Sequence, residues 1–489
     1  MSIANRTLLL ALAGILMLAL VPRDASARTR KVEVDLGKPR VVKSVKVRWR
    51  HGHNGRYRVQ TSLNGRRFKT AARVRTGRRH VSLRGRRARY VRLVGHGRRP
   101  RHVIVQAAAA TAPSADPSGW SAPWRAGVLP APLGPSRGTQ RFVAPSGSDA
   151  NPGTAALPWR SISKALKTAL PGDRVLVRAG TYSGLAGAGA DCGGSVGACV
   201  YGSPRGTATA PITVEAYPGE RPVIAAMVSF PSAQWFRFSG FIVDGAQAPE
   251  GAEGVSLGNT SGAAPSHVEI SYNEIRNFGR GGNHYSQGIL HYSGTDDALI
   301  GNRIHHIGRQ RFYDHGLYLK AGRRVVVANN VISDITGGYG VQIWGDFDDS
   351  WVINNTVYGA AASGFIVGGN NDRGRPDRTV TANNIFAGQT GTADSQQGYA
   401  AREYQPGSGN STRHNLGWAN ARSTAFYLAL AGPSDNKTAD PRFADAGRRD
   451  LHLRSGSAAV NTAESFGLLL DADRHSRGSA PDKGAFELG

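Results

Sequence analysis

The sequence predicts an all-β protein in which a small antiparallel β-sandwich precedes a long solenoid of stacked β coils. Four strand-length segments indicate the solenoid, because they begin with glycines at 288, 316, 340 and 364, which are 28, 24 and 24 residues apart. An asparagine ends a second strand in each coil, at Asn302, Asn330, Asn355 and Asn384. A near-constant period of strand-length units is typical of coils that stack to bury one continuous core.

The sandwich is predicted over residues 28–106, where apolar and polar residues alternate in "KSVKVRWR", "RYRVQTSL" and "RYVRLVG". Asn54-Gly55 and Asn64-Gly65 are typical turn pairs between such strands. Alternation means that one face of each strand packs and the other is solvated. The arginines of this module are therefore expected outside.

Nearly all of the net charge lies in this module. Residues 28–106 contain 26 Lys and Arg against Glu33 and Asp35, a net charge of +24 out of +27 for the whole chain. Such a surface favours an acidic polysaccharide or another polyanion. We expect no specific nucleic-acid partner, because the module has neither a helix to read a groove nor an aromatic stacking platform. The alternative is a soluble charged sandwich without a specific ligand.

Residues 1–27 have the features of a secretory signal peptide. Arg6 precedes an apolar run from Leu8 to Val21, and Ala25-Ser26-Ala27 fits a cleavage site. The apolar run is shorter than the ~20 residues of a membrane-spanning helix, and no later segment is long and apolar enough to span. We expect cleavage near Ala27 and a mature protein that is secreted or associated with the cell wall. We also expect a monomer.

A linker and the solenoid domain follow the basic module. Residues 107–139 are dominated by Ala, Pro, Ser and Gly without a period, which is typical of an extended linker. The solenoid domain is predicted over 140–489. Near its start, "SISKALKTAL" places Ile162, Ala165, Leu166 and Ala169 on one face of a helix, which would cover the open end of the solenoid.

Both domains resemble known families. "VEVDLGKPRVVKSVKVRW", "YRVQTSLNGRRFK" and "ARYVRLVG" resemble a discoidin (coagulation factor 5/8 type C) or galactose-binding-like module. The repeated coils, the opening "FVAPSGSDANPGTAALPWRSISKALKTALPGDRVLVRAGTY" and the C-terminal "DADRHSRGSAPDKGAFE" resemble the right-handed parallel β-helix of the pectate-lyase-like superfamily. That superfamily includes polysaccharide lyases, glycoside hydrolases, epimerases and proteins without known activity, so the fold alone does not imply a function.

Alignment of the coils by their glycines predicts which side chains share the outer face. Because side chains alternate in a strand, Tyr318, Gln342 and Ile366 form one external row, and Tyr292, Lys320, Trp344 and Gly368 form the next. Aromatic side chains that stack on sugars and cations that pair with carboxylates are the components of a carbohydrate groove. The predicted substrate contacts are Tyr318, Trp344, Gln342, Tyr292 and Asp314.

The favoured reaction is β-elimination in a uronate-containing glycan. A base removes the C5 proton, and the adjacent carboxylate must be neutralised by a cation, an amide or Ca2+. "YDH" at 313–315 resembles a shortened Tyr-Asp-Pro-His motif of alginate epimerases and related lyases. That resemblance implies His315 as base and Tyr313 as acid, with Arg311 or Lys320 as neutraliser.

Other functions remain open at this stage. An epimerase shares the first step, and a glycoside hydrolase needs two carboxyls, for which Asp346, Asp348 and Asp349 in "GDFDDS" are candidates. The same aspartates are the candidate Ca2+ ligands. A non-catalytic cell-wall polysaccharide-binding protein would use the same groove without turnover.

Cysteine occurs only at Cys192 and Cys199. Exported chains meet oxidising conditions, so a disulfide that closes this Gly-rich loop is expected.

Overall fold

A computed structural model describes residues 16–20, 29–49, 57–63, 65–74, 80–96, 100–107, 133–183, 199–249, 251–259, 263–279, 285–309, 312–370, 374–393, 397–422, 425–428 and 435–488. The chain divides into two compact units, Met1–Ser118 and Gly119–Gly489, and each is described by itself. Within the described residues, no helix is long and apolar enough to cross a membrane.

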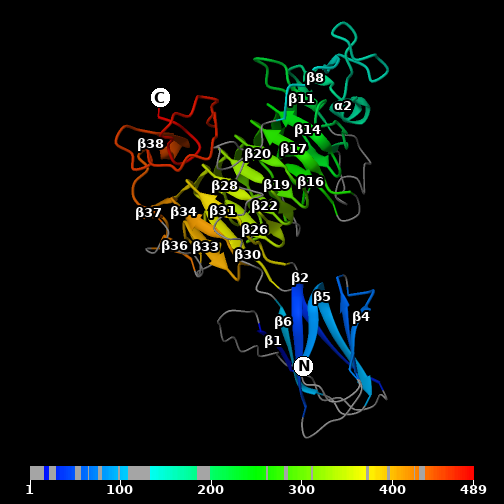
Figure 1. The fold of residues 1–489 in the computed structure, drawn as a ribbon. Coiled ribbons are helices and arrows are strands. Elements are labelled where there is room, and N and C mark those ends of the chain that lie inside the picture. The colour runs from blue at the N-terminus through cyan, green and yellow to red at the C-terminus, as the bar shows by residue number, and fades with distance from the viewer. Residues whose placement is uncertain are drawn as a thin grey trace. The chain divides into compact units, whose positions relative to one another are not determined.

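The first unit contains one antiparallel sheet of six strands (Figure 1). In order across the sheet they are β1 (Leu16–Leu20), β6 (Pro100–Ala107), β2 (Thr29–Trp49), β5 (His80–His96), β3 (Tyr57–Ser62) and β4 (Lys69–Val74). The long strands β2 and β5 stay paired through register shifts at Asp35/Arg40 and Val42/Ser44. Alternate valines such as Val45 and Val47 are fully buried, as the alternating sequence predicts. Strand β1 lies within the expected signal peptide, whose cleavage stays a prediction.

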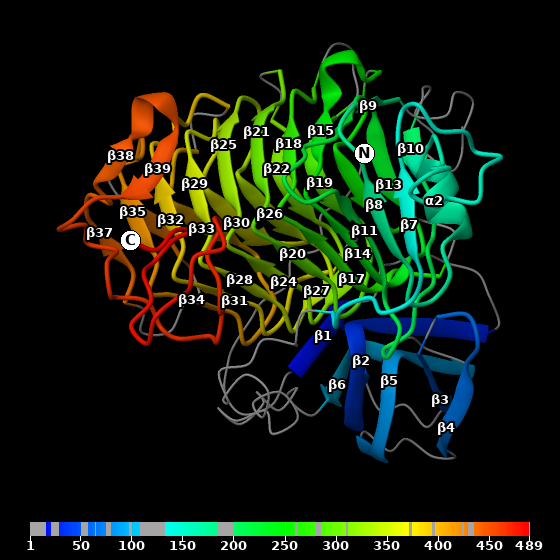
Figure 2. The same ribbon diagram turned by 90° about the horizontal axis from the view of Figure 1, so that it is seen from above.

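The second unit is a parallel β-helix with three long parallel sheets (Figures 1 and 2). The first, named the groove sheet, contains β10 (Cys199–Tyr201), β13 (Met227–Phe230), β16 (Val255–Leu257), β19 (Gln287–His291), β22 (His315–Leu319), β26 (Val341–Trp344), β30 (Phe365–Gly368), β33 (Ala401–Tyr404) and β36 (Phe426–Tyr427). The coils stack because each strand pairs with the equivalent strand of the next coil.

The other two sheets have ten strands each. The second sheet contains β7 (Gln140–Val143), β8 (Arg174–Val177), β11 (Ile212–Ala216), β14 (Gln234–Ser239), β17 (Ser266–Ser271), β20 (Ala298–Ile300), β24 (Val326–Ala328), β28 (Trp351–Ile353), β31 (Val380–Ala382) and β34 (Ser411–Arg413). The third contains β9 (Thr181–Tyr182), β12 (Val223–Ile224), β15 (Ile242–Asp244), β18 (Glu274–Arg276), β21 (Arg303–Ile307), β25 (Val331–Ile335), β29 (Thr356–Tyr358), β32 (Ile385–Ala387), β35 (Leu416–Trp418) and β37 (Lys437–Thr438). The predicted fold class is confirmed.

Short elements complete the solenoid. Helix α2 (Ile162–Thr168) begins at Ser161, whose hydroxyl accepts the Lys164 N–H, and it buries Ile162, Ala165 and Leu166. It contacts β10, the first strand of the groove sheet, so the predicted end-covering helix is confirmed. The remaining elements are β23 (Gly322–Arg323), β27 (Phe347–Asp348), β38 (Phe443–Asp445), β39 (Asp450–Leu453) and the 3-10 turns η2 (Gly245–Gln247) and η3 (Ala446–Arg448).

The stacked asparagines lie inside the turn between the second and third sheets. Asn330 Nδ2 donates to Asn355 Oδ1 at 2.9 Å, and Asn355 Nδ2 donates to Asn384 Oδ1 at 2.9 Å. The ladder also includes Asn273, Asn302, Asn415 and Asn436. The asparagines that end the second strands therefore stack through their amides from coil to coil. The left-handed residue of each such turn is the one before the ladder asparagine, such as Asn354 with φ 53°.

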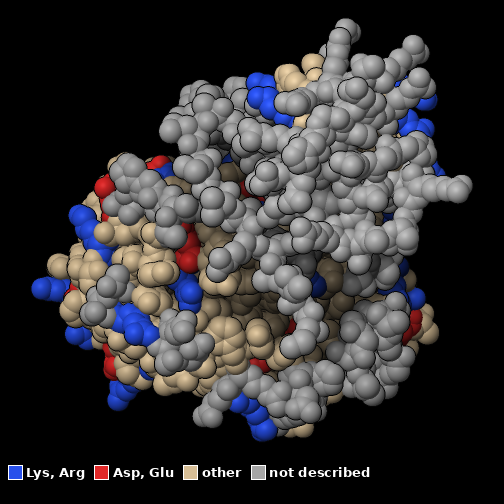
Figure 3. Space-filling view, turned by 90° about the horizontal axis from the view of Figure 1, so that it is seen from below, with Lys and Arg blue, Asp and Glu red and all other residues tan. Residues whose placement is uncertain are grey.

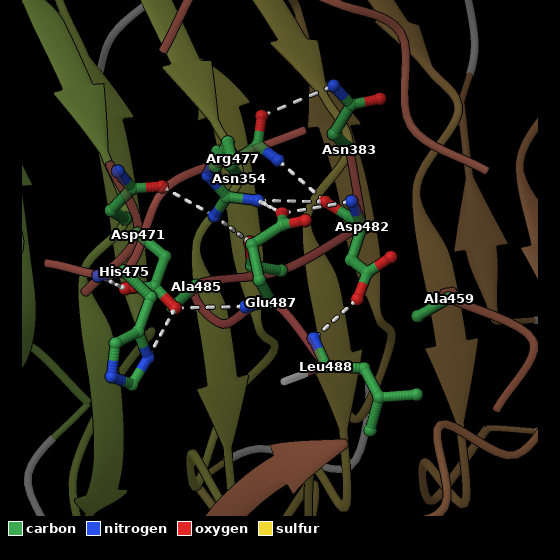
Figure 4. A network of polar contacts seen from close by, with 12 residues as sticks. Asn354, Asn383, Ala459, Asp471, His475, Arg477, Asp482, Ala485, Glu487 and Leu488 are labelled. Atoms are coloured by element: carbon green, nitrogen blue, oxygen red, sulfur yellow. Dashed lines mark hydrogen bonds and ion pairs between the residues drawn. The ribbon is translucent and has the colours of Figure 1, made fainter. Parts of the chain in front are cut away.

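The C-terminal segment packs across the turns of distant coils (Figure 4). The Arg477 guanidinium donates to the Asn329 side chain and to the Gly484 carbonyl, both at 2.8 Å. Asn354 Nδ2 donates to the Asp482 carbonyl at 2.9 Å. The contacts with Asn329 and Asn354 join residues more than a hundred positions apart in the sequence.

Candidate functional site

A groove of about 650 Å³ lies on the outer face of the groove sheet, over strands β19 to β33. Seven of its fourteen lining residues are aromatic, and Arg402 is the single cation among them. The described lining contains no carboxylate. The groove therefore offers stacking surfaces and one positive charge, which suits a sugar polymer better than a metal ion.

The strand register produces the predicted external rows. Tyr318 pairs with Gln342 and Gln342 with Ile366, and the row continues to Arg402 on β33. Trp344 pairs with Gly368 and then with Tyr404, and the rings of Trp344 and Tyr404 stack with centres 5.6 Å apart. The glycine alignment thus places Tyr318, Gln342 and Trp344 correctly on one face.

His315 lies at the edge of the groove but is almost completely buried, with 1% of its surface exposed. Its Nδ1 accepts the Tyr339 backbone N–H at 3.0 Å, so the neutral ring carries its proton on Nε2. Burial lowers the pKa of His315 to about 3, and the nearby Gln342 amide opposes that shift. At neutral pH His315 is therefore a hydrogen-bond donor, and this geometry does not favour the predicted role as base.

Hydrogen bonds between side chains and backbone groups hold the turn before β22. Both Asp314 oxygens accept backbone N–H groups, from Ser286 at 2.9 Å and from Arg309 at 3.1 Å. Asp314 is buried, so it holds the turn instead of facing a substrate. Gln287 accepts the His315 N–H and donates to the Tyr313 carbonyl, both at 3.0 Å. Gln287 thereby fixes Tyr313 and His315 relative to each other, which the sequence did not predict.

Tyr313 is half exposed and lines the groove. Its ring packs edge-on against Tyr285 with centres 4.8 Å apart, so the two rings form one wall. This position is open to a ligand. Arg311, the predicted neutraliser beside it, lies outside the described residues.

Lys320 and Tyr292 form a separate cluster on the outer face of the earlier coils. Lys320 Nζ lies 3.7 Å from the centre of the Tyr292 ring, a cation–π contact. Burial raises the pKa of Glu253 to about 7, while the Ser256 hydrogen bond and the positive charge of Lys320 lower it. Lys320 is not among the residues that line the groove.

Arg402 is the functional candidate that the sequence analysis missed. Its guanidinium lies 5.9 Å from the Tyr399 ring centre and 6.0 Å from that of Tyr404. Its Nε is buried without a hydrogen-bond partner. A buried donor without a partner is costly, so this atom is suited to bind an anion in the groove.

The aspartates of "GDFDDS" are engaged within the solenoid. Asp349 is buried and pairs with Arg323 at 3.0 Å and with Arg378, while Asp348 Oδ1 accepts the Asp377 N–H at 2.8 Å. Asp346 is exposed and faces Gly374. In the part of the chain that is described, no three His, Cys, Asp or Glu side chains form a group that fits a metal ion. The Ca2+ prediction gains no support from this donor set.

Charged side chains of both signs lie on the described surface of the solenoid. On the part of the face in Figure 3 that is not grey, Lys and Arg side chains lie at separate places, with fewer Asp and Glu side chains between them. Many are paired in the solenoid, for example Arg237 with Glu269 at 2.9 Å and Arg324 with Asp296 at 2.5 Å. Arg402 is thus distinguished by its position in the groove.

The predicted disulfide is not fully described. Cys199 is buried on β10, and Cys192 lies outside the described residues. The pairing of the two cysteines stays a prediction.

Two segments of the chain match protein families. Residues 23–93 match the family described as NedA-like, galactose-binding domain, and residues 145–235 match the family described as protein of unknown function (DUF1565). The first match confirms the predicted galactose-binding-like module. No curated protein matches the chain.

Similar solved structures include two lyases and a binding module. Pectate lyase Pel9A is 16% identical, with a TM-score of 0.43 over 73% of this chain and 98% of that chain. An alginate lyase from Paenibacillus sp. str. FPU-7 is 17% identical, with a TM-score of 0.36 over 57% of this chain and 90% of that chain. Chitosan-binding module 1 of a Paenibacillus sp. IK-5 chitosanase/glucanase is 22% identical, with a TM-score of 0.15 over 17% of this chain and 68% of that chain.

Proposed function

We propose that the protein is a secreted polysaccharide lyase that binds an acidic glycan in the groove and cleaves it by β-elimination. One observation carries this proposal: Arg402, with a buried and unpartnered Nε, lies in a groove whose described lining is half aromatic and free of carboxylates. A hydrolase would need two carboxyls across the scissile bond. The described lining of the groove supplies none.

In the proposed reaction Arg402 neutralises the carboxylate of the reacting sugar. A base takes the C5 proton, the electron pair forms the C4–C5 double bond, and the bond from C4 to its glycosidic oxygen breaks. The leaving oxygen takes up a proton, which the protonated base supplies. Neutralisation matters because negative charge develops on the carboxylate as the proton leaves.

The proposed base is the phenolate form of Tyr404, which lies beside the Arg402 cation on β33. The Tyr404 side chain is 44% exposed and stacks on Trp344, which leaves it accessible to a sugar. His315 has a different role here, because its accepting nitrogen is occupied by the Tyr339 N–H. Its Nε2 proton, which lies against the Gln342 amide, is shared with a ligand oxygen and so helps to position the glycan chain.

The test measures the absorbance of unsaturated uronate products with a panel of acidic glycans. Loss of one preorganised charge contact typically costs about 10²–10³ in rate, so we expect Arg402→Ala to lose about that much. Arg160→Ala is the matched control, because Arg160 is exposed and lies far along the solenoid from the groove. Tyr404→Phe is expected to abolish turnover while binding remains.

Two results would contradict the proposal. Equal activity of Arg402→Ala and Arg160→Ala would remove Arg402 from the reaction. No product from any acidic glycan, together with binding that Arg402→Ala weakens, would favour the non-catalytic polysaccharide-binding protein.

We also propose that the basic N-terminal module holds the protein on an acidic polymer. The net charge of +24 over residues 28–106 supports this. Lys43, Lys46, Arg58, Lys69 and Arg73 are exposed on its described strands. Affinity of the full chain for acidic glycans is expected to fall steeply as salt rises, because exposed charges are screened.

A further inference from the structure

We propose that the groove is specific for a mixed glycan, in which acidic sugars are separated by neutral sugars that donate hydrogen bonds. Polymers made only of uronate are the poorer ligands. This inference rests on the proposed function, because it names the class of acidic glycan that the groove accepts.

The first observation is the scarcity of positive charge. A uronate homopolymer lying across strands β22 to β33 would present a carboxylate on every sugar, but Arg402 is the single cation of the described lining. The other polar lining groups near it are neutral amides, including Gln342, Asn370 and Gln397. His315 adds no second cation, because its ring stays neutral down to a pKa of about 3.

The second observation is a pair of unsatisfied polar atoms in one row. Gln342 is 8% exposed, and its buried Oε1 faces the His315 ring, whose pKa this contact raises, but no hydrogen bond of good geometry reaches the oxygen. Arg402 Nε is the other unsatisfied atom. One atom requires a donor from the ligand, and the other requires an acceptor.

The strand register sets the distance between these two residues. Gln342 pairs with Ile366, and Ile366 pairs with Arg402, so two strand spacings separate them. That separation is about 10 Å along the solenoid, which is longer than one pyranose ring. The acceptor and the donor of the groove therefore address different sugar units.

These two contacts demand different chemistry from the two sugars. A carboxylate opposite Gln342 Oε1 would bring two acceptors together, and the buried oxygen would stay without a hydrogen bond. A hydroxyl or an acetamido N–H would satisfy it. At Arg402 a carboxylate is the favoured ligand group, because the guanidinium pairs with it.

The surface between the two contacts is apolar. Ile366 is 3% exposed, and Trp344 and Tyr404 stack along the adjacent row. Such a surface packs against the C–H faces of neutral sugars. It provides no compensation for a buried charge.

The test compares hyaluronan, in which glucuronate alternates with N-acetylglucosamine, with polygalacturonate. Binding and product formation are measured for the full-length protein and for two variants. Gln342→Leu removes the acceptor. Gln342→Glu keeps an acceptor of nearly the same shape and adds a negative charge. Thermal unfolding confirms that both variants are folded.

Each variant has a distinct expected result. Loss of one hydrogen bond weakens binding by about 10-fold. We therefore expect Gln342→Leu to weaken the binding of hyaluronan by that factor and to change the affinity for polygalacturonate by less than 2-fold. Gln342→Glu is expected to keep most of the affinity for hyaluronan and to bind polygalacturonate more weakly than the wild type does. Comparing variants with the same wild-type chain cancels the contribution of the basic module.

The two proposals fail in different ways. Faster cleavage of polygalacturonate than of hyaluronan, or an equal effect of Gln342→Leu on both, would overturn the mixed-glycan specificity and leave the lyase intact. If neither polymer is cleaved and Arg402→Ala changes binding of neither, the proposed function itself fails.

Discussion

His315 shows how a neighbouring coil determines the chemistry of a residue. In the sequence, a histidine beside Tyr313 predicts a base with an ordinary pKa. In the structure, the Tyr339 N–H occupies Nδ1, and burial holds the ring neutral. A side chain added at Gly338 would lie 2.2 Å from Nδ1, so the absence of a side chain there is needed for this contact. The result is a fixed donor at the edge of the groove.

The stability of the protein should record this shift. Burial lowers the pKa of His315 from 6.5 to about 3, so the unfolded chain binds a proton at higher pH than the folded one. The free energy of unfolding therefore has its full value above pH 6.5, and it decreases as the pH falls toward 3 because only the unfolded chain binds the proton. Between pH 7 and pH 5 it decreases by about 2 kcal/mol for this one group.

The measurement compares denaturant unfolding of the wild type and His315→Asn at both pH values. The variant lacks the titrating ring, so its free energy of unfolding is expected to fall by about 2 kcal/mol less than that of the wild type over this range. An identical pH dependence in the two proteins would show that His315 titrates normally in the folded state.

At the scale of strands, the sequence predicts rows well wherever the coils have similar lengths. The glycines at 316, 340 and 364 place Tyr318, Gln342 and Ile366 in one row because each coil differs little from the next. Arg402 was missed because its coil starts 36 residues after Gly364 and begins with Ala400. Asn415, 31 residues after Asn384, is the signal that could have found it. Individual contacts between coils, such as that of Gln287 with Tyr313, do not recur along the sequence, so no repeat pattern predicts them.

The asparagine ladder makes a prediction at the same scale. Asn355 accepts two hydrogen bonds from Asn330 and donates to Asn384 and Val327, all at 2.9–3.0 Å. Asn355→Ala leaves buried donors and acceptors unsatisfied on both neighbouring coils, so we expect a loss of about 3 kcal/mol in the free energy of unfolding. Denaturant titration measures this loss.

Asn436 is the matched control, because it ends the described ladder and contacts the Asn415 side only. Asn436→Ala is expected to cost less than half as much as Asn355→Ala. Equal costs would mean that the ladder contributes no more in the middle of the solenoid than at its end.

At the scale of the whole molecule, two devices hold the solenoid together. Stacking of coils gives contacts between neighbours only, whereas the C-terminal segment joins turns of different coils (Figure 4). Arg477 contacts Asn329, Asp482 contacts Asn354, and the Ala485 N–H donates to Thr356 Oγ1. The groove sheet lies on the same coils, so this segment supports the strands that carry Gln342 and Arg402.

The C-terminal segment supplies the last prediction. Arg477 is 8% exposed and pairs with Glu487, whose side chain is largely buried. Arg477→Met leaves that carboxylate without its cation, and removing one partner of a buried ion pair costs about 3–5 kcal/mol. We therefore expect a large fall in the unfolding free energy and weaker glycan binding near the melting transition. Arg448→Met is the matched control, since the Arg448 side chain is 88% exposed, and it should change stability very little. If Arg477→Met and Arg448→Met unfold alike, the segment packs on the solenoid without stabilising it, and the order of the groove strands depends on coil stacking alone.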